Sequence, residues 1–161
     1  MSKIKELIKD NDNILVFDVD GVLAIMEWGE YNHYELDDTA WTKMCEEGKN
    51  CYTKNCVSKK MQKFLKDKKM ENIYVITKVG NNNEGDFKKE FVNKYYGIPQ
   101  ENVYYVEKDS DKKAKLFEIK QNNKELEDYR IVMIEDSVNI LNDIMDNTNF
   151  STVHISSFLD I

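Results

Sequence analysis

The chain has 161 residues, of which 41 % are hydrophobic, and this is enough for the core of one domain of ordinary size. Its 23 basic and 30 acidic side chains give a formal net charge of −7, which argues against a DNA- or RNA-binding surface, because such surfaces normally carry a basic patch. No apolar run approaches the roughly 18 residues of a membrane span, so we expect no membrane association.

The first segment, MSKIKELIKDND, is short and charged, and its pattern predicts a helix. It lacks the apolar core of a secretory signal, so we expect a cytoplasmic protein. The cysteines Cys45, Cys51 and Cys56 are odd in number and have a spacing that is unusual for zinc. We therefore expect free, partly buried thiols rather than disulfides or a metal site.

Five short apolar runs predict strands. They cover residues 13–19, 72–77, 102–106, 130–136 and 152–156. Most of these runs are continuously apolar rather than alternating, which suits strands of a parallel sheet that is covered on both faces.

Helical patterns lie between the predicted strands. Apolar side chains recur at helical spacing in four segments: Val57, Met61, Phe64 and Leu65; Phe87, Phe91, Val92 and Tyr95; Ala114, Leu116 and Phe117; and Val138, Leu141, Ile144 and Met145. Each stripe is expected to pack on the sheet. The alternation predicts a single α/β domain over residues 1–161, with a doubly wound, Rossmann-like parallel sheet of about five strands and right-handed connections.

Residues 24–56 interrupt this alternation, because they are too numerous for an ordinary strand-to-helix loop. We interpret them as a small cap inserted after the first strand, with a helix at about 38–47, over the strand ends where such sheets bind ligands. The cap contains four aromatic side chains of interest, Trp28, Tyr31, Tyr34 and Trp41. They are expected to form its small core, with direct contact to substrate as the alternative.

The two histidines are not expected to be ligands. His33 lies in the polar part of the insertion and is expected to be exposed. His154 lies within the last predicted strand, where a histidine with satisfied hydrogen bonds is the simpler interpretation.

Four carboxylates follow or end predicted strands. Asp18 and Asp20 close the first strand, and Glu135 and Asp136 close the fourth. Because the carboxyl ends of parallel strands lie along one edge, these groups are expected to converge in one crevice, where they cannot all stay ionised unaided. A Mg²⁺ ion would make them compatible, since it takes hard oxygen ligands and keeps waters and phosphate oxygens as further ligands.

Two further polar features fall at the same edge. Thr77 ends the second strand, and Lys112 and Lys113 begin a helix for which Ser110 or Asp111 is the expected N-cap. A threonine and a lysine can bind phosphoryl oxygens as charge develops on them. One aspartate can then attack as a nucleophile, and a second can act as general acid and base.

Each feature also has a plain structural interpretation when it is taken alone. Asp-Gly is a common turn signal, and threonine is frequent in strands. A lysine at a helix start is often solvated, and Glu135 and Asp136 would suit the first turn of the following helix.

Together the motifs resemble those of the haloacid dehalogenase superfamily. FDVDGVL is similar to the first motif of that family, DxDG followed by apolar residues, and Thr77 after IYVI is similar to the second. The lysine pair at 112–113 resembles the third motif, and VMIEDS resembles the fourth. The four occur in the family's order between about residues 13 and 145, which implies a hydrolase domain of the small-cap type.

The resemblance implies a role for each matched residue. Asp18 would form an aspartyl-phosphate, and Asp20 would be the general acid and base, with its backbone carbonyl on the metal. Glu135 and Asp136 would complete the Mg²⁺ site. Either Lys112 or Lys113 would fill the third motif, and Thr77 the second.

The activity implied is Mg²⁺-dependent hydrolysis of a phosphate monoester. DVDGVLA is also similar to the start of the deoxyribonucleotidases, which makes a nucleotide monophosphate the specific expectation. Two alternatives remain. The EDS form of the fourth motif resembles that of phosphomutases, and a small cap would admit phosphoproteins or other macromolecules as substrates of a phosphatase. A signalling receiver domain is disfavoured because the DxD motif comes first, and an inactive interaction protein because all four motifs are present. The oligomeric state is left open.

Overall fold

A computed structural model describes residues 3–25 and 38–159 of the chain. Its sheet has the order β3-β2-β1-β4-β5, and all neighbouring strands are parallel. The strands are β1 (Ile14–Phe17), β2 (Ile73–Lys78), β3 (Val103–Val106), β4 (Ile131–Glu135) and β5 (Ser151–His154). The predicted α/β fold with a doubly wound parallel sheet of about five strands is confirmed.

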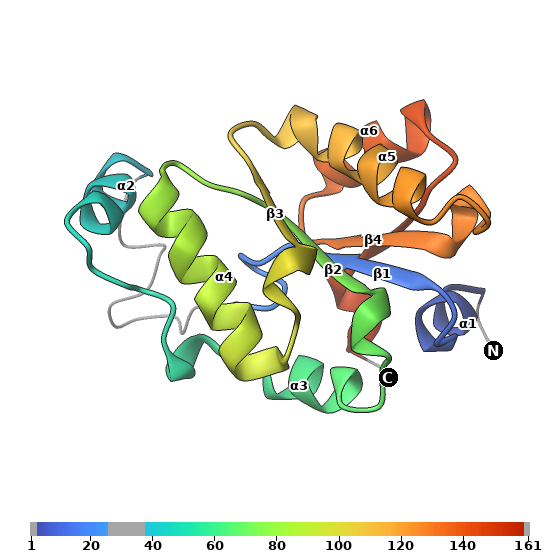
Figure 1. Cartoon of the computed structure of the whole chain (residues 1–161), viewed down its shortest axis with the longest axis horizontal. Coiled ribbons are helices and arrows are strands. Elements are labelled where there is room, and N and C mark those ends of the chain that lie inside the picture. The colour runs from blue at the N-terminus through green and yellow to red at the C-terminus, as the bar shows by residue number, and fades with distance from the viewer. Residues whose placement is uncertain (1–2, 26–37, 160–161) are drawn as a thin grey trace.

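Helices cover both faces of this sheet. They are α1 (Lys3–Lys9), α2 (Asp38–Glu46), α3 (Lys59–Leu65), α4 (Asn82–Tyr96), α5 (Lys112–Asn122) and α6 (Val138–Asn147). Short 3₁₀ turns span Lys54–Cys56, Met70–Asn72, Gln100–Asn102, Asp109–Asp111, Asp128–Arg130 and Ile155–Phe158. Figure 1 shows α5 and α6 on one side of the sheet and α1, α3 and α4 on the other, with α2 beside the N-terminal end of α4. In the described ranges, no helix combines the length and apolar character that crossing a membrane requires.

The central strand β1 explains why its sequence is apolar without alternation. Leu15 and Phe17 belong to the core on the side of α3 and α4, whereas Ile14 and Val16 belong to the core under α5 and α6. All four side chains are buried. A strand covered on both faces has no position for a polar residue, so the first polar position, Asp18, falls where the strand ends.

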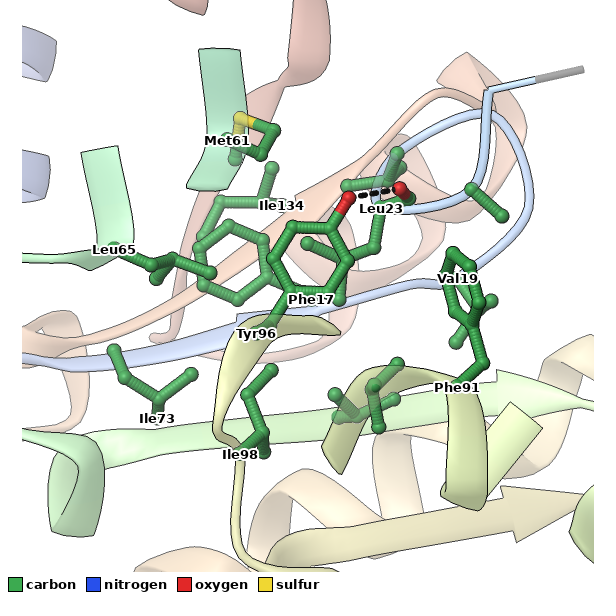
Figure 2. Close-up of a cluster of buried hydrophobic side chains, with 14 of the residues drawn as sticks. Phe17, Val19, Leu23, Met61, Leu65, Ile73, Phe91, Tyr96, Ile98 and Ile134 are labelled. Atoms are coloured by element: carbon green, nitrogen blue, oxygen red, sulfur yellow. Dashed lines mark hydrogen bonds between the residues drawn. The ribbon is translucent and has the colours of Figure 1, made fainter. Parts of the chain in front are cut away.

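The larger core holds the loop after β1 in place (Figure 2). The hydroxyl group of Tyr96, at the end of α4, donates a hydrogen bond to the carbonyl oxygen of Leu23 and accepts one from the backbone N–H of Ser58 at 2.8 Å. Tyr96 therefore ties the DxDG loop and the start of α3 to α4. The aromatic rings of Phe17 and Phe91 pack in the same cluster.

Three side chains of the predicted helical stripes are exposed instead of buried. Phe117, Val138 and Met145 are 46 %, 57 % and 57 % exposed, although they were assigned to buried stripes. In α5 the buried positions are Lys112, Leu116 and Ile119, so the helix is rotated away from the predicted stripe, and Phe117 packs at its margin on Phe150 with ring centroids 5.0 Å apart. Asp111 precedes α5, but its side chain makes no capping hydrogen bond.

The described part of the predicted insertion contains α2 and the segment that leads to α3. Trp41 is 5 % exposed and meets the ring of Tyr52 edge-on, with centroids 5.7 Å apart. This agrees with a core role for Trp41. Trp28, Tyr31, His33 and Tyr34 lie outside the described residues, so the expectations for them stay predictions.

Candidate active site

The carboxyl ends of β1, β2 and β4 meet at one edge of the sheet. The chain passes from β1 to β2 on one side and returns to β4 on the other, which makes β1 the place where the strand order reverses. Ligands of doubly wound sheets bind at such a point. Asp18 follows β1 and continues its ladder, because its backbone N–H donates to the carbonyl oxygen of Ile134 at 3.0 Å. Thr77 in β2 and Glu135 at the end of β4 are both buried.

Three of the four predicted acidic residues come together at this edge. Asp18, Glu135 and Asp136 each offer a carboxylate oxygen, and these oxygens lie within 4.8 Å of one another. Asp18 and Glu135 are buried and Asp136 is exposed. The Oδ1 atom of Asp18 is buried without a hydrogen-bond partner. Burial, only partly opposed by the positive charge of Lys112, raises the pKa of Asp18 to about 6.

Lys112 lies between two of these carboxylates. Its Nζ atom is 2.7 Å from Oε2 of Glu135, 3.3 Å from Oδ1 of Asp18 and 3.8 Å from Oδ1 of Asp109, and the side chain is 1 % exposed. Burial lowers the pKa of Lys112, but the negative charges of Asp18 and Glu135 outweigh it, so the net shift is upward. Lys112 is therefore a buried cation directed at the end of β1.

Lys113, the alternative to Lys112 in the sequence analysis, points away from the acidic cluster and toward α6. The Nζ atom of Lys113 is 2.8 Å from Oδ1 of Asp143 on α6. Successive residues of an α-helix point about 100° apart, so only one of two adjacent lysines faces the strand ends. Of the two alternatives, the structure brings Lys112 to the acidic cluster and directs Lys113 to Asp143 on α6.

The acidic cluster suits a Mg²⁺ ion by its donor chemistry. Lys112 is the one ammonium group within 4 Å of Asp18 and Glu135 among the described residues, so a single positive charge faces two buried carboxylates, and Asp18 Oδ1 has the ion-pair contact but no hydrogen bond. An ion with hard oxygen ligands meets that need. Gly21 makes room for this arrangement: its φ is +72°, and a Cβ atom there would lie 2.3 Å from Oδ2 of Asp136.

Hydrogen bonds around the cluster orient its members. Oε1 of Glu135 accepts hydrogen bonds from the backbone N–H groups of Asp136, at 3.1 Å, and Ser137, at 3.2 Å. Its other oxygen therefore faces Lys112. The Nε2 atom of His154 contacts the carbonyl oxygen of Asp136 at 3.0 Å, and its Nδ1 atom contacts Oγ of Ser156 at 2.7 Å. Both ring nitrogens of His154 are occupied, as the sequence predicted.

The carboxylate of Asp20 is not in this cluster and has its own cation. Oδ2 of Asp20 is 2.7 Å from Nζ of Lys88, a residue of α4 that is 1 % exposed. Oδ1 of Asp20 accepts a hydrogen bond of 3.0 Å from the hydroxyl group of Tyr52. Both carboxylate oxygens are thus held. The predicted contribution of Asp20 to a metal through its backbone carbonyl stays a prediction.

Glu84, one turn before Lys88 on α4, joins these groups to the insertion. Its Oε1 atom is 3.0 Å from Nζ of Lys88 and accepts hydrogen bonds from Tyr52, at 3.3 Å, and from the indole N–H of Trp41, at 3.4 Å. Its Oε2 atom accepts the backbone N–H of Gly80 at 2.8 Å. Lys88 also donates to Oγ1 of Thr77 at 3.3 Å. We call Asp20, Tyr52, Glu84 and Lys88 the Lys88 network.

Sequence reasoning missed the Lys88 network, although a signal for it was present. Lys88 falls within the apolar stripe of Phe91 and Tyr95, at a spacing of three and seven residues, and Glu84 continues the stripe one turn earlier. Charged residues on the buried face of a helix need partners, so the pair Glu84 and Lys88 marked a buried polar contact.

A pocket of about 220 Å³ opens beside Asp20. It is lined by Asp20, Trp41, Thr42, Lys78, Val79, Gly80, Glu84 and Lys88. This volume is below the roughly 300–1,000 Å³ of sites that enclose a whole ligand, so the pocket suits the part of a ligand next to its reacting group.

The cysteines take no part in the site. Cys45, Cys51 and Cys56 form no disulfide bond among the described residues, and Cys45 and Cys56 are buried. Burial raises the pKa of Cys45 to about 12, so this thiol stays protonated and unreactive.

Comparisons with known proteins give a fold but no family. No protein-family model and no curated protein matches the sequence. A solved structure of DsGPDH of Dunaliella salina matches 96 % of this chain with a TM-score of 0.57 and 14 % identity, and this chain spans 25 % of that protein. The HAD domain of effector protein Lem4 from Legionella pneumophila matches 88 % of this chain and 84 % of its own length, with a TM-score of 0.48 and 12 % identity. The likeness to DsGPDH extends to the fold alone.

Proposed function

We propose that this protein is a Mg²⁺-dependent phosphatase of the haloacid dehalogenase type, which hydrolyses a phosphate monoester through an aspartyl-phosphate on Asp18. One observation carries the proposal. Asp18 is buried at the end of the central strand, its Oδ1 atom has no hydrogen bond and lies 3.3 Å from Nζ of Lys112, and two further carboxylates are within reach. A buried carboxylate with this surplus of negative charge suits an ion and a phosphoryl group better than a structural role.

In the first step, a carboxylate oxygen of Asp18 attacks phosphorus and the bond from phosphorus to the ester oxygen breaks. Asp20 gives its proton to the departing oxygen. Lys112 and Thr77 contact the phosphoryl oxygens as charge develops there. Thr77 accepts a hydrogen bond from Lys88, and its hydroxyl proton makes only a long 3.5 Å contact to the carbonyl oxygen of Lys78, so it is available to a phosphoryl oxygen.

In the second step, water attacks the phosphorus of the aspartyl-phosphate, and Asp20 takes the proton from that water. The bond between phosphorus and Asp18 breaks, so inorganic phosphate leaves and both aspartates return to their starting states. Mg²⁺ held by Asp18, Glu135 and Asp136 would supply a positive charge that offsets the negative charge of the phosphoryl group.

The substrate we propose is a phosphorylated small molecule, with a nucleotide monophosphate as the specific candidate. The pocket beside Asp20 supports this choice, since it offers Trp41 and polar side chains to the group that carries the phosphate. A phosphoprotein would instead place a peptide across this edge of the sheet, and a substrate panel separates the two.

The test uses the purified chain with nitrophenyl phosphate, then with a panel of nucleotide monophosphates, sugar phosphates and phosphopeptides. We expect hydrolysis with Mg²⁺, none with EDTA, and recovery when Mg²⁺ is restored. Asp143→Asn, which alters a partly exposed carboxylate on α6, serves as a control and should keep its activity. Full activity in EDTA would exclude the metal, and no hydrolysis of any phosphate ester would exclude the proposed function.

A further inference from the structure

The Lys88 network differs from a structural ion pair because it holds both oxygens of a single carboxylate. Lys88 contacts Oδ2 of Asp20 at 2.7 Å, and Tyr52 donates to Oδ1 at 3.0 Å. These contacts come from different directions, one from α4 and the other from the segment between α2 and α3. Together they fix the position of the Asp20 carboxylate and the rotation about its last bond.

The buried charges of the Lys88 network are not explained by stability alone, because taking them out of water costs free energy. The side chains of Lys88 and Glu84 are 1 % and 7 % exposed, and the Tyr52 residue is 3 % exposed. A buried ion pair is often no more stable than apolar side chains of the same volume. Lys88 lies on the same side of α4 as Phe91 and Val92, where a leucine would satisfy packing.

The one part of the network that opens outward is Asp20. Its side chain is 31 % exposed, and it lines the pocket together with Trp41 and Thr42. A carboxylate has about four acceptor positions, and Lys88 and Tyr52 occupy two of them. The other positions belong to a side chain that lines the pocket, where the group attached to a phosphate would sit.

We propose that Lys88 and Tyr52 are positioning residues, which hold the Asp20 carboxylate toward the leaving group in the pocket so that it can transfer its proton. This inference rests on the proposed phosphatase function and extends it to two residues outside the four sequence motifs. Lys88 and Tyr52 make no contact with Asp18 in the described structure, so they act on proton transfer rather than on nucleophilic attack. Glu84 anchors both of them, since it accepts hydrogen bonds from each.

Tyr52 allows the cleaner test of the two. Lys88 also donates to Thr77, so Lys88→Met would disturb phosphoryl binding as well as Asp20. Within residues 3–25 and 38–159, the hydroxyl group of Tyr52 has hydrogen bonds with Asp20 and Glu84 alone. Tyr52→Phe removes that hydroxyl and keeps the ring that packs on Trp41 and Phe91.

The experiment measures kcat/KM for aryl phosphates of similar size but different leaving groups. Phenolate is a poor leaving group that needs a proton, whereas dinitrophenolate departs without one, and kcat/KM covers the steps through its departure. Asp20→Asn sets the scale, with an expected loss of about 10²–10⁴-fold on phenyl phosphate. Tyr52→Phe should lose about tenfold on phenyl phosphate and less than about twofold on dinitrophenyl phosphate. Lys88→Met should lose more on phenyl phosphate than Tyr52→Phe does, and it should also lose activity on dinitrophenyl phosphate, because Thr77 loses its contact with Lys88.

A matched control is provided by Tyr96→Phe. Tyr96 is another buried tyrosine of the same core, and in the part of the chain that the structure describes its hydroxyl has hydrogen bonds only with the backbone of Leu23 and Ser58. Any loss in Tyr96→Phe should therefore be uniform across the aryl series. Thermal melts show which variants fold. If Lys88→Met does not fold, Tyr52→Phe alone tests the positioning role.

The outcomes separate this inference from the function on which it rests. Losses that are equal on phenyl and dinitrophenyl phosphate, or no loss in Tyr52→Phe, would overturn the positioning role while hydrolysis that depends on Asp18 remains. A wild-type chain without Mg²⁺-dependent hydrolysis of the aryl series would overturn both.

Discussion

Two buried lysines serve the two aspartates of one short motif, and they approach from opposite sides of the sheet. Lys112 extends from α5 to Asp18, and Lys88 extends from α4 to Asp20. Each lysine side chain is 1 % exposed. In this chain the two aspartates of the DxD motif are therefore paired with lysines from different helical layers.

The partners of the two lysines differ in their access to water. Lys112 is paired with Glu135 and Asp18, whose side chains are 1 % and 10 % exposed, whereas Lys88 is paired with Glu84 and with Asp20, which is 31 % exposed. The Lys112 group is enclosed by strand ends, and the Lys88 network borders a pocket. In the proposed mechanism the enclosed group would carry the covalent chemistry and the open one the proton transfer, and experiments can test this division.

The largest expected effect separates the two aspartates. Asp18→Asn should lower kcat/KM by at least about 10³-fold for every aryl phosphate, because it removes the nucleophile. Asp20→Asn should keep much of its activity on dinitrophenyl phosphate, which needs no proton donor. Steady-state kinetics with circular dichroism as a check on folding tests this, and a similar loss in both variants on dinitrophenyl phosphate would remove the contrast.

The next effect concerns stability. Lys112→Met should lower the free energy of unfolding by about 3–5 kcal/mol, because it leaves two buried carboxylates without a cation. Lys88→Met should lower the free energy of unfolding by less than Lys112→Met does, because water reaches the carboxylate of Asp20. Lys115→Met, which breaks the partly exposed pair with Glu118, should change it by no more than about 1 kcal/mol. Urea denaturation gives the order, and a greater loss in Lys88→Met than in Lys112→Met would contradict it.

Stabilisation of the folded chain by Mg²⁺ should depend on the carboxylates of the enclosed side. Mg²⁺ at about 100 times its Kd should raise the free energy of unfolding by about 2.7 kcal/mol, because it binds the folded chain. Asp136→Asn should lose most of this increase, and Asp143→Asn should retain it. Thermal melts with and without Mg²⁺ measure the effect, and an equal increase in the Asp136→Asn variant would place the ion elsewhere.

The smallest effect compares two glycines with the same backbone conformation. Gly21 and Gly97 have φ of +72° and +73°, but a Cβ atom would meet Asp136 at Gly21 and nothing within 4 Å at Gly97. Both alanine variants should lose about 1–2 kcal/mol of unfolding free energy to backbone strain. Only Gly21→Ala should also lose its response to Mg²⁺. A normal Mg²⁺ response in that variant would show that Asp136 can move without consequence.

The sequence identified the residues of the enclosed side, whereas on the open side it identified Asp20 but not the residues that hold it. Asp18, Thr77 and Glu135 end or follow continuous apolar runs, and parallel pairing brings the ends of such strands to one edge whatever the loops between them do. The same reasoning limited the site lysine to Lys112 or Lys113. The choice between Lys112 and Lys113 depends on which face α5 turns toward the sheet. The structure shows this face, because Lys112 is buried and Phe117 is exposed.

Lys88 and Tyr52 were missed for a different physical reason. Lys88 lies in the middle of a charged helix next to Lys89, and composition alone does not distinguish a buried lysine from a solvated one. Tyr52 reaches Asp20 across 32 positions of the chain, from an insertion with no regular pattern. Contacts of this kind depend on tertiary packing, whereas strand ends are fixed by topology.

The burial of Trp41 against Glu84 gives the molecule an optical probe of its own pocket. The chain has two tryptophans, so replacing Trp28 by phenylalanine leaves Trp41 as a single emitter. Its indole N–H donates to the carboxylate that also binds Lys88 and Tyr52, and its ring lines the space beside Asp20. The fluorescence of Trp41 would then report occupancy of that space in real time, without any added label.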